Sequence, residues 1–210
     1  RKLRIDDEIR IINLTKRFGD LTVFDHLNLA FQKGQTTCLM GESGCGKTTL
    51  IHLMIGLLKP EKGKITGIEG SRISMVFQEN RLCRHLSGLC NCMLPLKSTE
   101  ENRKRVRNLL FEVGLDAMAV EKPVFELSGG MQRRVAIIRA LAADSDIIFM
   151  DEPLKEMDEH TEELVVQCIR RESGGKTLIL STHNVEDAER FSANLVYLES
   201  SFINNHSEKN

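Results

Sequence analysis

The sequence predicts an α/β fold with a mostly parallel sheet, an N-terminal antiparallel β part and an inserted helical subdomain. Short apolar stretches alternate along the chain with longer segments of helical character, which is typical of a parallel sheet covered on both faces. The apolar stretch 36–40 runs into a glycine-rich loop, and a polar region at 79–126 interrupts the alternation. The length of 210 residues fits one domain.

The N-terminal part combines strands with one helix. Strands are expected at 9–13 and 26–31, joined by a glycine-containing turn. Glycines bound a short apolar strand at 36–40, and a helix at 47–58 is expected to end before Pro60.

The rest of the chain alternates in the same way around the polar, cysteine-bearing region, which is helical at 100–113. The other expected elements are strands at 73–77, 146–150, 177–181 and 194–198, and helices at 129–143, 159–171 and 185–191. The single domain, 1–210, is expected to have a core at about 1–78 and 127–199, a helical subdomain at about 79–126 and a polar tail at 200–210.

The composition is that of an ordinary globular protein, with 41% hydrophobic and 28% charged residues. A net charge of -1 gives no general attraction to nucleic acid or to an anionic membrane. The six cysteines lack the paired spacing of a zinc site, which favours free thiols in a reducing compartment. No apolar run approaches the roughly 20 residues that cross a bilayer. If the protein serves a membrane, we expect it to do so from outside the lipid.

The stretch GESGCGKT, from Gly41 to Thr48, matches the phosphate-loop pattern G-x-x-x-x-G-K-[ST] in full. Glycines let amide N–H groups converge on one anion, and the start of the following helix favours negative charge. Lys47 is expected to reach the β- and γ-phosphates, and the Thr48 hydroxyl to bind Mg²⁺. The segment Asn-Lys-x-Asp, which reads guanine, is absent from the sequence. The expected nucleotide contacts are Gly41, Glu42, Ser43, Gly44, Cys45, Gly46, Lys47, Thr48 and Thr49.

An apolar stretch at 147–150 delivers two acidic residues, Asp151 and Glu152. Ligands of open α/β sheets bind beyond the carboxyl ends of the strands. Asp151 is expected to hold Mg²⁺ through water. Glu152 points differently, because side chains alternate along an extended chain, and is expected to polarise an attacking water. A solvated acidic turn before Pro153 is the alternative interpretation.

The stretch LSGGMQ begins at Leu127 and precedes a helix. Ser128 is the expected N-cap, and Gly129 and Gly130 allow close approach of the backbone. This is a second helix start suited to a phosphate, although an ordinary serine-capped helix would look the same.

These motifs, in this order, resemble the nucleotide-binding subunit of an ABC transporter over about 9–198. Further residues that carry the resemblance are Phe18 in KRFG, Gln78 in VFQEN, Asp158, and His183 in STH. The resemblance implies a P-loop NTPase core of the ABC type, and an ATPase whose hydrolysis of ATP is coupled to transport. In the family two subunits meet head to tail. The residues that would contact ATP in trans are Ser128, Gly129, Gly130 and Asp158.

The resemblance also implies individual roles. Phe18 would stack on adenine, Gln78 would sense Mg²⁺ and water, and His183 would contact the γ-phosphate and help to orient Glu152. The implied catalytic residues are Glu152, His183, Gln78 and Lys47. The implied Mg²⁺ residues are Thr48, Gln78 and Asp151.

The implied partners are a second copy of the chain, integral membrane permease subunits and, indirectly, an extracytoplasmic solute-binding protein, without nucleic acid. The implied location is the cytoplasmic face of the cell membrane. The stretches QENRLCRHLSGLCNCMLPLK and DEPLKEMDEHT resemble bacterial importers of the nitrate, sulfonate and taurine type, which implies import of a small anionic or polar solute. Two alternatives stay open: the ATPase of an exporter or lipoprotein-release complex, and a soluble ABC ATPase without transport.

The sequence departs from the family pattern at three residues. Lys155 and Glu156 bring charge to a segment that is commonly small, near the expected dimer seam, and Cys45 stands where a serine or small residue is common. A docking face for the permease is expected at 81–96. Its expected apolar residues are Leu82, Leu86, Leu89 and Leu94, and for any one of them packing in the core of the helical subdomain is an equal alternative.

Overall fold

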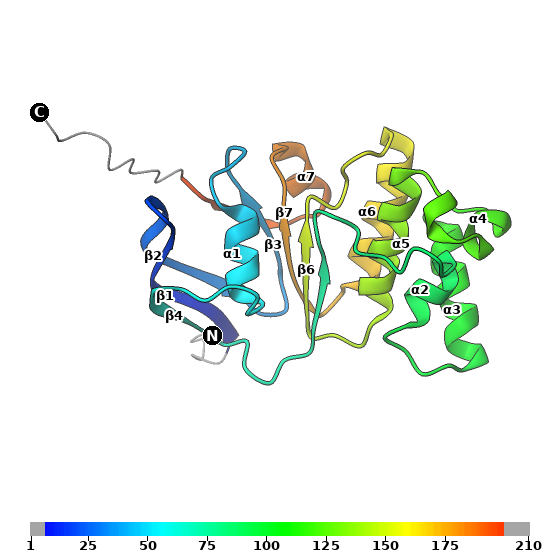
Figure 1. Cartoon of the computed structure of the whole chain (residues 1–210), viewed down its shortest axis with the longest axis horizontal. Coiled ribbons are helices and arrows are strands. Elements are labelled where there is room, and N and C mark those ends of the chain that lie inside the picture. Colours follow the sequence, from blue (N-terminus) through cyan, green and yellow to red (C-terminus); the bar gives the residue numbers. More distant parts are fainter. Residues whose placement is uncertain (1–6, 200–210) are drawn as a thin grey trace, which may run out of the picture. The chain divides into compact units, whose positions relative to one another are not determined.

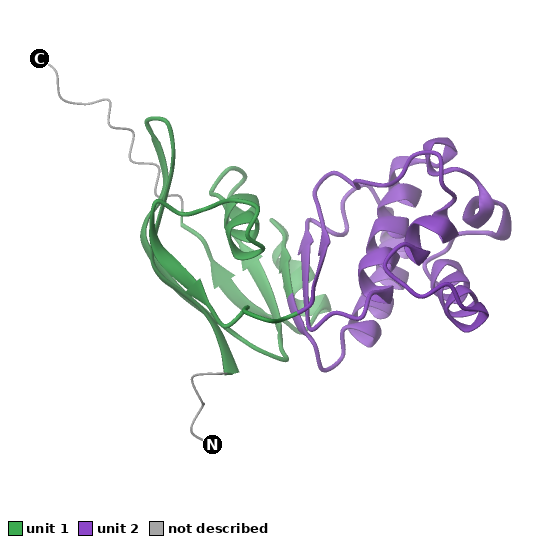
Figure 2. Cartoon of the chain, turned by 60° about the horizontal axis from the view of Figure 1, so that its bottom comes forward, with its two compact units in different colours: residues 1–71, 179–210 green, residues 72–178 purple. Residues whose placement is uncertain are grey.

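The computed structural model describes residues 7–199 and divides the chain into two compact units. Unit 1 comprises residues 1–71 and 179–210, and unit 2 comprises residues 72–178 (Figure 2). The polar tail expected at 200–210 lies outside the described residues. Within the described part of the chain, no helix is both long and apolar enough to cross a membrane.

Unit 1 contains the antiparallel sheet. Its strands β1 (Glu8–Phe18), β2 (Leu21–Gln32) and β4 (Lys62–Thr66) lie in the order β2-β1-β4 (Figure 1). The register between β1 and β2 shifts on either side of Leu14. Asn13 lies at one shift with a positive φ of 47°, so the long strand contains a bulge and does not alternate strictly.

Unit 1 also contains a parallel pair that leads to the glycine-rich loop. β3 (Thr36–Met40) pairs in parallel with β8 (Asn194–Tyr197). Helix α1 (Lys47–Met54) follows the loop, and α7 (Val185–Arg190) packs against β3. The strand β7 (Thr177–Ser181) contains the border between the two units.

The expected extension of helix α1 to Leu58 is wrong, because the helix ends at Met54. Gly56 adopts a left-handed φ of 77°, and the amides of Leu57 and Leu58 both donate to the carbonyl oxygen of His52. This closes the last turn through a glycine, as is common at helix C-termini.

Unit 2 contains a second parallel pair, β5 (Ile73–Val76) with β6 (Ile147–Asp151). Its central helix is α5 (Gly129–Ala142), whose inner face is apolar. Helix α5 packs against β5 and three helices, α2 (Gly88–Met93), α3 (Glu100–Glu112) and α6 (Glu159–Glu172) (Figure 1). A short helix, α4 (Ala117–Glu121), and a 3₁₀ turn, Val124–Glu126, complete the unit. The α/β class, with parallel and antiparallel parts, is confirmed.

An arginine and an aspartate tie β5 and β6 together where the strands begin. Arg72 donates to Asp146 Oδ2 from its backbone N and its Nε, at 2.9 and 3.2 Å, and to Oδ1 from Nη2 at 2.8 Å. These hydrogen bonds hold the pKa of Asp146 at about 2. The two strands therefore start in a fixed register.

The side chain of Asn91 forms hydrogen bonds with the backbone of the segment that precedes α2. This side chain is fully buried, and its Oδ1 accepts from the backbone N of Cys83 at 2.8 Å. Its Nδ2 donates to the carbonyl oxygens of Cys83, Leu86 and Ser87 at 3.0–3.2 Å. One amide side chain therefore determines the path of the backbone from 83 to 87.

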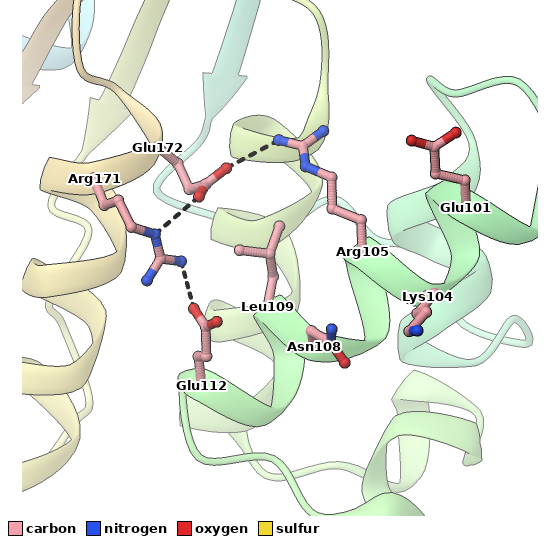
Figure 3. Close-up of a pocket in the computed structure, with 8 residues that line it drawn as sticks. All are labelled: Glu101, Lys104, Arg105, Asn108, Leu109, Glu112, Arg171 and Glu172. Atoms are coloured by element: carbon pink, nitrogen blue, oxygen red, sulfur yellow. Dashed lines mark hydrogen bonds and ion pairs between the residues drawn. The ribbon is translucent and has the colours of Figure 1, made fainter.

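Charged side chains of α3 and α6 line a pocket in unit 2 (Figure 3). Arg105 donates to Glu172 at 2.9 Å, and Arg171 donates to both Glu172 and Glu112. Burial raises the pKa of Glu172, but the hydrogen bonds from Arg105 and Arg171 outweigh this and leave the pKa below its ordinary value. These groups satisfy one another, so they form a structural network that joins the two helices.

Candidate functional site

The phosphate loop of unit 1 connects β3 to α1 through glycines in conformations that other residues avoid. Gly41, Gly44 and Gly46 have φ values of 152°, 85° and 104°. A Cβ on Gly41 would lie 2.5 Å from the Sγ of Cys45 and 2.6 Å from the carbonyl oxygen of Leu198. The loop therefore needs a glycine where it leaves the strand.

Lys47 is folded into this loop and is only 7% exposed. Its Nζ donates to the carbonyl oxygens of Gly41, at 2.6 Å, and Glu42, at 2.9 Å. Cys45 is buried in the same loop, with its Sγ 3.9 Å from Nζ. The only cation of the loop is thus fixed at its centre.

The start of α1 is suited to an anion. Gly46 is the N-cap in a left-handed conformation, and it has no side chain that could cap the helix. Lys47, Thr48 and Thr49 form the first turn, and the N–H groups of a first turn point out of the helix along its axis. Together with the helix dipole, these N–H groups favour a bound phosphate.

Two other predicted residues lie in unit 1. Phe18 ends β1 and is 47% exposed, with the ammonium of Lys16 4.9 Å from the centre of its ring. His183 is exposed in the turn between β7 and α7. The hydroxyl of Thr182 stabilises this turn, because it donates to Asp187 at 2.5 Å and accepts from the backbone N of Asn184 at 3.0 Å.

The predicted acidic pair lies in unit 2. Asp151 is the last residue of β6 and is 1% exposed. Glu152 follows it with a φ of 49°, which is uncommon for a residue other than glycine. Gln78 is exposed in the segment that follows β5, the parallel neighbour of β6. The sheet thus brings the two segments to the same edge of unit 2.

Arg133 connects these two segments, and the sequence did not predict a role for it. Its Nη1 donates to the carbonyl oxygen of Phe77 and, at 3.2 Å, to the side-chain oxygen of Asn80. Its Nη2 donates to the carbonyl oxygens of Asp151 and, at 2.9 Å, Glu152. One guanidinium therefore contacts the chain on both sides of Gln78 and at both acidic residues.

The environment of Arg133 is unusual for an arginine. The side chain lies among the buried residues of α5 and is 4% exposed. Burial lowers its pKa, while the nearby Asp151, Glu152 and Glu156 raise it. A sequence signal did exist, because Arg133 falls on the apolar stripe of the helix together with Ile137.

The second glycine-rich motif also lies in unit 2, at the start of α5. Ser128 is the N-cap, as expected, and its Oγ accepts from the backbone N of Met131 at 3.2 Å. Ser128 and Gly129 are exposed. A Cβ on Gly129 would lie 2.7 Å from the Oε2 of Glu156. A Cβ on Gly130 would lie 2.7 Å from the carbonyl oxygen of Glu156. Glu156 thus packs against the motif.

Asp158 caps the next helix, α6. Its side chain accepts from the backbone N of Thr161 at 3.0 Å and from its hydroxyl at 2.7 Å. These hydrogen bonds lower the pKa of Asp158. The carboxylate is exposed, so it combines a cap with a charge at the surface.

The expected docking face is partly wrong. Leu86 and Leu94 are 38% and 55% exposed, but Leu89 is fully buried, because it lies on the inner side of α2. Phe125 is 48% exposed and packs edge-on against His85, with ring centres 5.7 Å apart. No clear pattern in the sequence indicates an exposed role for Phe125, which lies in the 3₁₀ turn Val124–Glu126.

The predicted site residues are divided between the two units. Unit 1 holds Phe18, the phosphate loop and His183, whereas unit 2 holds Gln78, the motif at Ser128, the acidic pair and Asp158. Each unit therefore contains a helix start bordered by glycines, one after β3 and one before α5.

Comparisons with known proteins identify the family of this chain. A family model described as ABC transporter matches residues 24–155. A thiamine import ATP-binding protein of Jannaschia sp. is 36% identical over 91% of this chain and 89% of its own length. A taurine import ATP-binding protein of Roseobacter denitrificans is 40% identical over 86% of this chain and 73% of its own.

Solved structures agree with this result. A dimeric ATP-binding cassette in a post-hydrolysis state, bound to ADP and Pi, has a TM-score of 0.80 and is 31% identical to this chain. The match covers 91% of this chain and 94% of the cassette. The family model's match over residues 24–155 includes the glycine-rich loop, the serine-capped helix and the acidic pair. The chain therefore belongs to the ABC transporter family, as one of its ATP-hydrolysing subunits.

Proposed function

We propose that this chain powers import of a small anionic or polar solute, and that two copies close head to tail around ATP to do so. The observation that carries the proposal is the presence, in one chain, of two glycine-bordered helix starts together with a buried acidic strand end. Each helix start suits a phosphate, but a single copy uses only one of them for its own nucleotide.

The phosphate loop is proposed to hold the ATP of its own copy. The N–H groups at the start of α1 would bind the phosphate oxygens, and Lys47 would turn from the carbonyl oxygens of Gly41 and Glu42 to the β- and γ-phosphates. Phe18 would stack on the adenine from its exposed position at the end of β1.

The residues present fit Mg²⁺. Thr48, Asp151 and Gln78 supply a hydroxyl, a buried carboxylate and an amide, and Mg²⁺ prefers such oxygen ligands. Thr48 would bind it directly, and Asp151 would hold it through water. The ion would neutralise charge on the phosphates.

Glu152 is proposed to orient and polarise the water that attacks the γ-phosphate. Its φ of 49° directs it away from the course of β6, so its side chain does not follow that of Asp151. His183 would contact the γ-phosphate and help to orient Glu152, and Gln78 would sense the water and the metal. The exposure of both side chains fits contact with a ligand.

A second copy is proposed to complete each site. Its Ser128, Gly129 and Gly130 would contact the γ-phosphate in trans, and its Asp158 would lie at the seam. Hydrolysis removes the group that bridges the two copies, so the closed state loses its stability. The dimeric cassette bound to ADP and Pi supports this arrangement.

The relatives named for import of thiamine and taurine support import rather than export. We propose a location at the cytoplasmic face of the membrane, bound to permease subunits and supplied by a solute-binding protein. Leu86, Leu94 and Phe125 would form the docking face, which we define by these three residues, because they are exposed and apolar.

The nucleotide part of the proposal is tested with Glu152→Gln. This variant is expected to bind ATP without hydrolysing it and therefore to elute as a dimer when ATP and Mg²⁺ are present. The control is Glu159→Gln, which removes an exposed carboxylate in the first turn of α6 and should behave as wild type. Hydrolysis by Glu152→Gln at the wild-type rate would remove Glu152 from its assigned role.

The transport part is tested with the permease encoded beside this chain, reconstituted in vesicles. ATP on the side that carries this chain should drive uptake of solute from the opposite side. Movement in the other direction would favour an exporter, and failure to bind any permease would favour a soluble ATPase.

A further inference from the structure

We infer that Arg133 is a positioning residue that couples the signature motif, the stretch Leu127–Gln132, to the hydrolytic residues of the same copy. The inference rests on the proposed function, because it assigns Gln78 and Glu152 to hydrolysis and Ser128 to the partner's ATP. The inference adds a physical connection between the motif at Ser128 and the residues Gln78 and Glu152. Every contact that supports this connection lies within unit 2.

The guanidinium of Arg133 lies between two segments of the chain. Nη1 faces the chain that leaves β5 and Nη2 faces the chain that leaves β6, so the fork spans the two segments. Nη2 donates to Glu152 at 2.9 Å, and Nη1 lies 3.5 Å from the carbonyl oxygen of Gln78. A guanidinium has donors on both sides, whereas an ammonium is a point charge.

These two segments need support. The pairing of β5 with β6 ends at Val76 and Met150, and β6 itself ends at Asp151, so residues 77–80 and 152–155 lie beyond the strands. Glu152 also has a left-handed φ, which costs free energy unless the surroundings stabilise it. Arg133 supplies hydrogen bonds where the strand pairing stops.

The stability of the fold alone does not account for a buried arginine at position 133. Among residues 7–199, Nε of Arg133 is the one buried side-chain nitrogen or oxygen without a hydrogen-bond partner. A buried charge costs desolvation free energy, and an apolar side chain often replaces one without loss of stability. The arginine therefore fits a role in positioning the segments that follow β5 and β6 better than a role in stabilising the core.

Arg133 lies near the start of its helix, α5. Ser128 caps α5, and Arg133 follows only slightly more than a helical turn later. Because a helical turn moves as a rigid body, a phosphate that draws the start of α5 toward the partner also moves the guanidinium. Occupancy of the motif would thus change the placement of Gln78 and Glu152.

The first test uses hydrogen exchange on the nucleotide-free protein and compares Arg133→Gln with Arg139→Gln. Arg139 lies on the same helix and donates to the carbonyl oxygens of Arg81 and Asn80, but not to β6 or the segment after it. Arg133→Gln should speed exchange in both segments, 77–80 and 151–155, whereas Arg139→Gln should affect only the first. Unchanged exchange at 151–155 in Arg133→Gln would overturn the inference.

The second test measures ATP hydrolysis and binding of MgATP. For Arg133→Gln we expect kcat to fall about 10- to 100-fold, since a displacement near 1 Å has effects of this size, while Kd stays within about 3-fold. The Hill coefficient should fall toward 1. Arg133→Lys keeps the charge but reaches only one of the two segments, so its kcat should lie between those of Arg133→Gln and wild type. The lysine variant replaces the glutamine variant in these measurements if the glutamine variant does not fold.

The outcomes separate the two claims. If wild type hydrolyses ATP and folded Arg133→Gln keeps its kcat and Hill coefficient, the inference fails and the proposed function stands. If Kd rises as much as kcat falls, Arg133 acts on binding and the inference is again overturned. If exchange changes as expected but Glu152→Gln hydrolyses ATP normally, the connection exists and the assigned role of Glu152 fails.

Discussion

Lys47 donates a hydrogen bond from its ammonium to the carbonyl oxygen of Gly41, across the phosphate loop, at 2.6 Å. The same ammonium reaches Glu42 at 2.9 Å, so the lysine supports the loop in which it lies. Because carbonyl oxygens are weaker acceptors than phosphates, the lysine has a stronger partner to turn to when ATP binds.

Replacement of this lysine is therefore expected to affect both the loop and its ligand. Lys47→Ala should lower ATP hydrolysis by at least about 100-fold, because it removes the charge that we propose turns to the transferred phosphoryl group when ATP binds. The loss of its charge-assisted hydrogen bonds to the two carbonyl oxygens should cost about 1.5–3 kcal/mol of unfolding free energy. Steady-state hydrolysis and thermal unfolding check both values, with the exposed Lys59→Ala as control.

The glycines of the loop predict a graded effect on stability. A Cβ on Gly46 would lie 2.7 Å from the Cζ of Phe24 and 2.8 Å from the Cγ1 of Val23, whereas one on Gly44 would meet no described atom within 4 Å. Both have positive φ, so both alanine variants carry backbone strain.

Gly46→Ala should therefore be less stable than Gly44→Ala by about 1–3 kcal/mol, which is the usual cost of overpacking. Urea unfolding of the two variants isolates the steric contribution, since the backbone strain is common to both. Equal midpoints would show that the side chains of β2 move aside without cost.

The carboxylate beside the signature motif predicts a gain of function. A Cβ on Gly129 would lie 2.7 Å from the Oε2 of Glu156, so this charge stands where the partner's phosphate is expected. Repulsion between unit charges about 4 Å apart in water is worth about 1 kcal/mol, which is roughly a 5-fold change in affinity.

Glu156→Ala is thus expected to strengthen ATP-dependent dimerisation about 5-fold at low salt, and less at high salt, where charges are screened. The measurement is analytical ultracentrifugation in a Glu152→Gln background, with Glu159→Ala as a charge-matched control. A weaker dimer would mean that Glu156 supports the motif through its packing.

The network of α3 and α6 predicts a dependence of stability on pH. The pKa of Glu172 is lowered from its ordinary value of 4.5, so the folded state gains stability above that pH and loses it as pH falls through the lower, folded value. Arg171→Gln should cost at most about 1 kcal/mol at pH 7, because the arginine is half exposed.

The difference between Arg171→Gln and wild type should then narrow as pH falls below 4.5, toward the lower pKa at which Glu172 becomes protonated in the folded state. Denaturant titrations at several pH values measure it, with the exposed neighbour Arg170→Gln as control. A difference that is constant down to strong acid would assign the cost to packing of the arginine stem.

The sequence predicted the elements that have one dominant signal. The strands 36–40 and 177–181 agree with the structure, because apolar runs between polar boundaries leave little choice. The strand β4 was missed because Lys62–Thr66 contains a single large apolar residue and owes its conformation to pairing with β1. The first two strands are longer than predicted, since bulges interrupt their alternation.

The residues of the candidate site were likewise predicted where one local pattern in the sequence dominates. Motifs with fixed spacing, such as the phosphate loop, are legible because their chemistry depends on adjacent residues. Arg133 acts on segments more than 15 residues away in either direction, at separations of 18 and 56 along the chain, and only the fold brings them together. The place of Arg133 on the apolar stripe of α5 indicates that it is buried, but it does not indicate which segments it contacts.

Asn91 has a consequence for how such subunits diversify. Since the amide secures the loop below Leu86 through four hydrogen bonds, the backbone there keeps its course whatever side chains it displays. The outward residues are free to vary while the platform beneath them stays constant. If the docking face lies here, as proposed, a change of a few surface side chains would alter the fit to a membrane partner and leave the backbone beneath them in place.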